Sequence, residues 1–217
     1  MKKLIIFGAG DLARLVSFYI EELNETKIIA YSVDDKYYTS ETYLGKPLIP
    51  YSRIKRYAGT LNTPPLLVTI GYADMKARET IFKRIKNDGF TTTNFIGSKL
   101  AKTCKLGTNN IILPNVQIEP FTEIGDNNIF WNGSHVCHDA SINSHNFFAA
   151  NSLIGGNVII KNGCFIAFNS TVIQNVTVED DTLLGAGAVL TESNKKNRKY
   201  LGCPAKEVGK NTRGIKL

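Results

Sequence analysis

The sequence is poor in histidine and cysteine and lacks any long apolar run. Its 217 residues include three histidines and four cysteines, and no two cysteines have the CxxC spacing of a zinc or redox motif. No stretch approaches the ~18 consecutive apolar residues of a membrane-spanning helix, and the apolar residues 4–7 run straight into a glycine turn. These absences argue against membrane insertion and against a disulfide-stabilised secreted fold. They favour a cytoplasmic protein with reduced thiols.

Positive charge is in excess but is not concentrated. Lys and Arg number 26 against 19 Asp and Glu, which gives a formal net charge of +7. The basic residues are dispersed except for one run at 195–199, and no basic helix with interleaved aromatic residues is present. We therefore expect no nucleic-acid partner, whereas small phosphorylated ligands suit this charge.

An uninterrupted six-residue repeat dominates the second half of the chain. Every sixth position is aliphatic or Phe, and the residue two places earlier is mostly small. An α-helix would need apolar spacings of three and four. Asn and Gly cluster between the repeats, where they accept the backbone angles of corners. The repeat predicts a coil of short strands whose inward side chains are Leu100, Leu106, Ile112, Ile118, Ile124, Phe130, Val136, Ile142, Phe148, Ile154, Ile160, Ile166, Val172, Val178, Leu184 and Leu190.

The first half has the pattern of a small α/β unit with parallel strands. We predict strands at 3–7, 28–33 and 66–70 and helices at 12–22 and 73–87. Residues 8–13 form a G-x-G-x-x-A turn between strand and helix, where helix amides can hold phosphate. Two acidic residues, Asp34 and Asp35, end the second strand, where they could bind ribose hydroxyls or a base. We assign residues 1–95 to this domain and 96–217 to the repeat domain with its C-terminal tail.

This layout resembles a family of bacterial acyltransferases. The repeat is similar to that of hexapeptide-repeat enzymes, and the whole chain resembles the nucleotide-aminosugar N-acetyltransferases and the related NeuD-like sialic acid O-acetyltransferases. The resemblance implies a Rossmann-like N-terminal domain and a left-handed parallel β-helix of a little over five coils. It also implies a homotrimer with active sites between subunits. The implied activity is direct, metal-independent transfer from acetyl-CoA to the amino group of a nucleotide-linked aminosugar in surface-glycan biosynthesis.

In the resembling enzymes the N-terminal domain holds the nucleotide sugar. The positions of this chain that match their binding residues are Gly8, Gly10, Asp34, Asp35 and Gly71. One departure lies in the glycine turn, where Asp11 replaces the glycine or serine that is frequent in the family. A carboxylate close to a diphosphate would repel it.

The three histidines, His135, His138 and His145, fall within eleven residues of the repeat. The phase of the repeat places His138 at a corner with its side chain outward, and Asp139 follows it. A sugar ammonium must lose a proton before its nitrogen can attack a thioester, and histidine accepts a proton near neutral pH. The resemblance likewise places the general base at His138, with Asp139 as its acidic neighbour. We expect His135 to orient the substrate.

The resemblance also implies the residues that bind the acetyl donor. A second histidine, nine residues after the base, contacts the donor in the resembling enzymes. Here that position is Phe147, and the nearby His145 is out of register. Either residue, or a backbone amide, is expected at the thioester. Lys206 belongs to a segment that packs near the CoA adenine end in the family. The remaining expected contacts are the corner residues Gly155, Gly156, Ala167, Phe168, Gly185 and Ala186.

Three alternatives stay open at this stage. The first is O-acetylation of a sialic acid type of sugar, which needs the same base. The second is a zinc site like that of the gamma-class carbonic anhydrases, although those sites use histidines at least a coil apart and His135 and His138 are three residues apart. The third is a non-catalytic NAD-binding module on a β-helix scaffold, which would bind NAD but not CoA.

Overall fold

The chain divides into two compact units, and each is described by itself. The computed structural model describes residues 2–211. One unit contains the residues up to 71 together with 80–95, and the other contains 72–79 and the residues from 96 onward. The segment 72–79, which we assigned to the first domain, therefore groups with the second unit. Within residues 2–211, no helix combines the length and the apolar character needed to cross a membrane.

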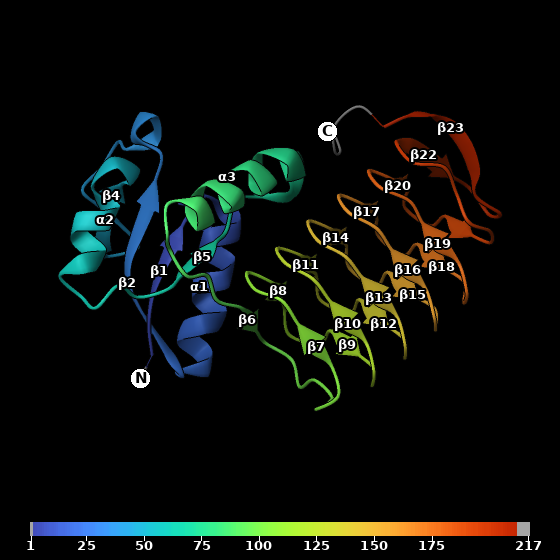
Figure 1. Cartoon of the computed structure of the whole chain (residues 1–217), viewed down its shortest axis with the longest axis horizontal. Coiled ribbons are helices and arrows are strands. Elements are labelled where there is room, and N and C mark those ends of the chain that lie inside the picture. Colours follow the sequence, from blue (N-terminus) through green and yellow to red (C-terminus); the bar gives the residue numbers. More distant parts are fainter. Residues whose placement is uncertain (1, 212–217) are drawn as a thin grey trace. The chain divides into compact units, whose positions relative to one another are not determined.

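The first unit is built on a five-stranded sheet of order β3-β4-β2-β1-β5 (Figure 1). The strands are β1 (Lys2–Phe7), β2 (Thr26–Val33), β3 (Thr42–Tyr43), β4 (Lys46–Pro50) and β5 (Leu66–Val68). All neighbours pair in parallel except β3, which forms an antiparallel edge with β4. The inner strand β1, which lies between β2 and β5, is apolar and buried from Leu4 to Phe7, as expected of a parallel strand covered on both faces.

The predicted helices of this region are present. They are α1 (Asp11–Leu23) and α3 (Met75–Asn87), and the latter follows the short 3₁₀ turn η2 (Tyr72–Asp74). A second 3₁₀ turn, η1 (Asp35–Tyr37), follows β2. We did not predict β3, β4 or α2 (Tyr51–Gly59), because prolines flank the short apolar core of β4 and polar residues fill the surrounding segment.

The second unit is a left-handed parallel β-helix, visible in Figure 1 as a row of stacked coils. Each two-residue strand pairs in parallel with the strand eighteen residues later, as in His135↔Leu153. Wall one contains β7 (Lys105–Leu106), β10 (Glu123–Ile124), β13 (Ser141–Ile142), β16 (Ile159–Ile160) and β19 (Thr177–Val178). Wall two contains β8 (Ile111–Ile112), β11 (Ile129–Phe130), β14 (Phe147–Phe148), β17 (Phe165–Ile166) and β20 (Leu183–Leu184). Wall three contains β9 (Gln117–Ile118), β12 (His135–Val136), β15 (Leu153–Ile154), β18 (Thr171–Val172) and β21 (Val189–Leu190).

Wall two is longer than the other walls. The strand β6 (Phe95–Ile96) lies at its beginning, and β22 (Arg198–Leu201) and β23 (Lys206–Lys210) extend its end. The outward side chains of β8, β11, β14, β17 and β20 are also buried, among them Ile111, Ile129 and Phe147, whereas walls one and three carry exposed outward side chains. Arg78, in the segment 72–79, is fully buried and donates from Nη2 to the Asn109 carbonyl at 3.3 Å, just before wall two begins.

The corners repeat as regularly as the core. From Asn109 to Gly187, a residue with positive φ occurs at every sixth position, most often Asn or Gly. These types reach the left-handed region at low cost, which explains why the repeat concentrates them there. At the corner between walls one and two, the buried amides Asn110, Asn128 and Asn146 form a ladder. Each Oδ1 accepts the backbone N–H of the residue eighteen positions later, at 2.7–2.9 Å.

The predicted inward positions form the core of the β-helix. Fourteen of the sixteen lie in one buried cluster, and Leu100 and Leu106, at the open end, pack against it. The small residues two places earlier, such as Ala140 and Ala188, are buried beside them. The phase of the repeat is therefore confirmed.

Adjacent positions 159 and 160 allow the phase to be tested with matched chemistry. Ile160 points inward and is fully buried, whereas Ile159 points outward and is exposed. We expect Ile160→Ala to lower the free energy of unfolding by about 2–5 kcal/mol, because it leaves a cavity in a packed core. Ile159→Ala is expected to cost less than about 1 kcal/mol. Urea unfolding followed by circular dichroism measures both, and equal losses would contradict the assignment.

Candidate active site

His138 lies at the corner between walls three and one, with its side chain largely exposed. Its Nδ1 is 2.8 Å from Asp139 Oδ2. Because an ionised carboxylate can only accept, Nδ1 carries the hydrogen in the neutral ring and Nε2 keeps its lone pair. Asp139 is also the left-handed residue of this corner, with φ of 58°. One residue therefore shapes the corner and fixes the tautomer of the histidine.

The residue above His138 in the next coil is Gly156. A Cβ at this position would lie 3.1 Å from both Nε2 and Cε1 of His138. Any larger side chain would crowd the ring edge that carries the free lone pair. The sequence singled out Gly156 as a donor contact, and the structure adds that it leaves room beside the candidate base.

Glu119 is part of this corner and was not predicted. It lies one coil before His138, and its Oε2 accepts the His138 backbone N–H at 2.9 Å. Its Oε1 is 2.7 Å from His135 Nε2, which must donate. The hydrogen bond from His135 is the main reason that the pKa of Glu119 lies below its usual value, with a further contribution from the His138 amide. A search for an acid nineteen residues before the base would have found it.

The same corner contains the group whose spacing comes nearest to a metal site among residues 2–211. The ligand atoms of Glu119, His135 and Cys137 lie within 4.8 Å of one another. However, His135 Nε2 and Glu119 Oε1 are at hydrogen-bonding distance, whereas two ligands of a tetrahedral zinc ion lie about 3.3 Å apart. Burial raises the pKa of the Cys137 thiol, which disfavours the thiolate that a metal or a nucleophile would need. The arrangement is that of a hydrogen-bonded histidine–carboxylate pair.

The first unit has a cavity of about 370 Å³ at the carboxyl ends of β1 and β2. Gly8, Gly10 and Asp34 line it together with the aromatic residues Tyr37 and Tyr43. The lining is mostly apolar with hydroxyl groups from residues 39, 40 and 42, as suits a nucleoside. Tyr43 donates to the Gly10 carbonyl at 3.2 Å, and burial raises the pKa of its phenol.

The acidic residues near this cavity have different roles. Asp34 reaches the cavity, and its Oδ1 pairs with Arg84 Nη2 at 2.5 Å. Asp35 instead accepts from the Ser52 N–H at 3.0 Å in the first turn of α2, and it does not line the cavity. Asp11 projects into solvent beside Arg14, so its carboxylate is not part of the lining either. Gly71 is also absent from the lining. The structure thus supports Asp34 but gives Asp35 a capping role.

His145 and Phe147, which we expected at the thioester of the acetyl donor, are both buried in this chain. His145 is the left-handed residue of the corner between walls one and two, and its Nδ1 is 2.9 Å from Asn127 Nδ2. Phe147 stacks on Phe165 at 4.7 Å between ring centroids on the buried outer face of wall two. Both side chains are buried in this chain, so neither presents a surface to an acetyl donor.

The remaining predicted donor contacts lie along two different edges of the β-helix. Gly155 and Gly156 follow β15, on the same edge as His138, between walls three and one. Ala167, Phe168, Gly185 and Ala186 follow β17 and β20, on the edge between walls two and three. Phe168 is exposed there, and Lys206 is exposed on β23. Wall three separates the two edges within one chain.

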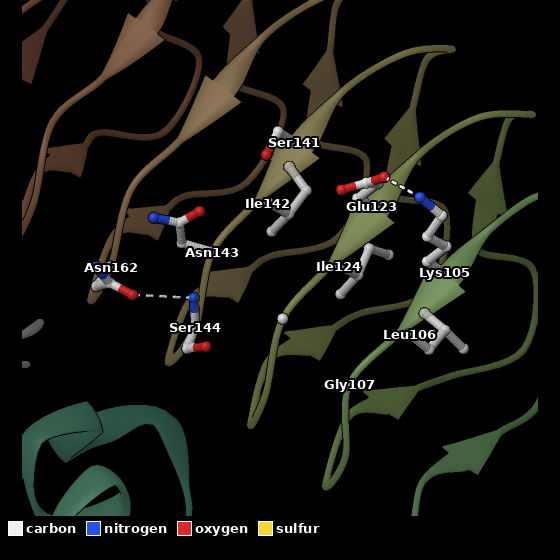
Figure 2. A pocket seen from close by; sticks show the side chains of 11 residues that line it. Lys105, Leu106, Gly107, Glu123, Ile124, Ser141, Ile142, Asn143, Ser144 and Asn162 are labelled. Atoms are coloured by element: carbon white, nitrogen blue, oxygen red, sulfur yellow. Dashed lines mark hydrogen bonds and ion pairs between the residues drawn. The ribbon is translucent and has the colours of Figure 1, made fainter.

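A shallow hollow of about 580 Å³ lies on wall one, away from these edges (Figure 2). Its floor carries Lys105, Glu123 and Ser141, with Lys105 Nζ 2.5 Å from Glu123 Oε1. At its edge, Asn162 Oδ1 accepts the Ser144 backbone N–H at 3.1 Å. His138 does not line this hollow. Its size therefore does not identify it as the catalytic centre, because the candidate base lies elsewhere.

Comparisons with known proteins agree with this architecture. Residues 3–85 match the PglD N-terminal domain family, and residues 103–138 match the bacterial transferase hexapeptide family. No curated protein matched the sequence. A histidine-to-alanine variant of GDP-perosamine N-acetyl transferase from Caulobacter crescentus, solved with CoA and GDP-perosamine, is 24% identical with a TM-score of 0.86, over 96% of this chain and 98% of that one.

Two further solved structures are similar over nearly the whole chain. The acetyltransferase domain of PglB from Neisseria gonorrhoeae, in complex with acetyl coenzyme A, is 20% identical with a TM-score of 0.84, over 95% of this chain and 99% of that one. WeeI from Acinetobacter baumannii is 19% identical with a TM-score of 0.66, over 96% and 100%. These similarities confirm the predicted fold, an α/β domain followed by a left-handed β-helix.

Substitutions at Gly8 and Gly10 can distinguish a structural role in the turn from a role in ligand binding. A Cβ on Gly8 would lie 2.6 Å from Thr69 Oγ1, and its φ of +133° is strained for other residues. We expect Gly8→Ala to destabilise the fold by about 1–3 kcal/mol. A Cβ on Gly10 meets nothing within 4 Å. Gly10→Ala should therefore keep the melting temperature while weakening nucleotide binding measured by calorimetry. Unchanged binding by Gly10→Ala would remove this residue from the site.

Proposed function

The chain joins a PglD N-terminal domain to bacterial transferase hexapeptide repeats, and from this premise we propose that it is an acetyl-CoA-dependent sugar N-acetyltransferase. The proposed acceptor is the amino group of a nucleotide-linked aminosugar used in surface-glycan synthesis. The observation that carries the proposal is the His138–Asp139 pair at an exposed corner of the β-helix, beside a glycine that keeps Nε2 accessible.

The pair has the properties of a general base. The acceptor ammonium must give up a proton, and Nε2 of His138 carries the lone pair that receives it. Asp139 holds the Nδ1 hydrogen and stabilises the imidazolium that forms. The amine nitrogen then bonds to the thioester carbonyl carbon, the carbon–sulfur bond breaks, and the sulfur leaves with the electron pair. The proton on His138 passes to the sulfur, which restores the neutral imidazole, and the nitrogen releases its second proton to solvent as the amide forms.

The proposed nucleotide site is the cavity of the first unit. Backbone amides that follow Gly8 and Gly10, at the beginning of α1, suit a diphosphate. Arg84 pairs with Oδ1 of Asp34, and Asp34 lines the cavity. We propose that the second carboxylate oxygen of Asp34 accepts a hydrogen bond from a ribose hydroxyl or a base. In the similar structure from Caulobacter crescentus, the bound nucleotide sugar is GDP-perosamine. That precedent and the apolar lining support a nucleotide sugar as the ligand here.

The proposed donor site requires more than one copy of the chain. The base and Gly155–Gly156 lie on one edge of the β-helix, and the other donor contacts lie on the next edge, across wall three. In a homotrimer, one edge of each copy can face the other edge of its neighbour, which would complete a cleft for the pantetheine arm. We therefore propose a trimer, with a mass three times the 24.0 kDa of the chain, to be measured by light scattering.

His138→Ala tests the proposed mechanism. We expect a loss of about 10²–10⁴ in kcat for CoA release, because a positioned base contributes that factor. CoA binding and the trimer mass should persist, since the side chain lies on the surface. Retention of more than about a tenth of the wild-type rate would show that His138 is not the base.

The acceptor is tested with a panel of UDP-, dTDP- and GDP-linked aminosugars and a free sialic acid. We expect CoA release with a nucleotide-linked aminosugar. Release only with the sialic acid would replace N-acetylation by O-acetylation, and NAD binding without CoA binding would overturn the transferase proposal.

A further inference from the structure

Glu119 makes two hydrogen bonds that converge on the corner of the candidate base. It follows β9, and its own N–H donates to the Val136 carbonyl at 2.9 Å in the next coil. Its side chain also reaches into that coil, where Oε2 accepts from the His138 N–H and Oε1 accepts from His135 Nε2. Both partners belong to the segment that carries His138, so the carboxylate ties this segment to the coil before it.

We infer that Glu119 is a positioning residue for the base, which holds the His138 backbone through one oxygen and is itself anchored by His135 through the other. This inference rests on the proposed function and adds a residue that was not among the predicted site residues. It also gives His135 a different role from the one we expected, since its Nε2 is engaged with Glu119 rather than directed to a substrate.

The backbone contact matters because the corner has few other restraints. The Asp139 N–H is 3.3 Å from the Pro120 carbonyl, and the His138 carbonyl accepts from the Asn157 N–H at 3.1 Å. The His138 N–H, by contrast, has Glu119 as its acceptor. Loss of the carboxylate would free this amide and allow the corner, and with it the imidazole, to shift. Displacements of about 1 Å in a catalytic group can reduce rates by about 10².

The charge of Glu119 has a second effect on the same group. Asp139 contacts the His138 ring on its own corner, and Glu119 contacts the His138 backbone N–H from the preceding coil, whereas residues 155–157 of the following coil are uncharged. The nearby thiol of Cys137 has a raised pKa and is neutral at physiological pH, and His135 donates to Glu119. Two carboxylates therefore lie at the corner that carries the imidazole. Removing one charge favours the neutral ring.

Two substitutions separate the charge from the hydrogen bonds. Glu119→Gln keeps an acceptor oxygen but loses the charge, and we expect the rising limb of the kcat–pH profile to move to lower pH with a kcat loss of about tenfold. Glu119→Ala also frees the His138 amide and is expected to lose about 10² in kcat. The KM for acetyl-CoA should change less than about twofold in both variants, because the effect acts through the base.

Glu123→Gln is the matched control. Glu123 lies in the same coil on wall one, and its carboxylate pairs with Lys105 at the surface. The Glu123→Gln substitution should leave both kcat and the pH profile unchanged. A shift of the rising limb of the kcat–pH profile in Glu119→Gln but not in Glu123→Gln supports the inference. Unchanged kcat and an unchanged limb in both Glu119 variants would overturn it, as would equal shifts in Glu119→Gln and Glu123→Gln.

A second readout does not depend on the reaction. The NMR titration of the His138 ring protons should have its midpoint at lower pH in Glu119→Gln than in the wild type, and at an unchanged pH in Glu123→Gln. If the wild type acetylates none of the sugars offered, the proposed function fails while this titration still tests the link between Glu119 and His138. An unchanged midpoint in Glu119→Gln would contradict the electrostatic part of the inference even in an active enzyme.

Discussion

The stacking of each residue on the one eighteen positions later is the constraint on which the β-helix depends. Each two-residue strand finds its backbone partners in the neighbouring coils, so a shift of one residue would break the ladders of all three walls. The left-handed corner residues, six positions apart, close each turn at the same place. The same rule arranges the candidate active site, because Gly156 lies eighteen residues after His138 and Glu119 lies nineteen before it. The residues that meet at this corner therefore belong to three successive coils.

The sequence predicted those features that depend on one coil at a time. The six-residue period defined the inward positions, and the His138–Asp139 pair could be recognised because the two residues are adjacent. Glu119 was missed because its contact crosses from one coil to the next, and a carboxylate at an outward position is ordinarily a solvated surface group. The role of Gly156 beside Nε2 depends on the same vertical relation, so its spacing alone could not reveal it.

At three of the predicted site positions, the structure shows contacts that the sequence did not indicate. His145 and Phe147 were expected near the acetyl donor because the resembling enzymes have a donor-contacting histidine nine residues after the base. Wall two is apolar on both faces, however, and its outer side chains are buried. The segment 72–79 belongs to this unit and is far from wall two in sequence, which the hexapeptide pattern cannot encode. In the first unit, Asp35 was paired with Asp34 by adjacency, but it caps α2, an element whose short and polar sequence gave no signal.

Asp139 shows how the demands of fold and chemistry meet in one residue. The corner requires a residue that tolerates a φ near 58°, which favours Asn, Asp or Gly. The base requires a negatively charged acceptor at Nδ1, which favours Asp or Glu. Only Asp satisfies both conditions, because Glu is disfavoured in the left-handed region and Asn lacks the charge. At other corners, where no base has to be held, Asn and Gly predominate. Asp139 therefore suits both the corner and the proposed base beside it, although Asp181 shows that Asp also occupies a corner with no neighbouring histidine.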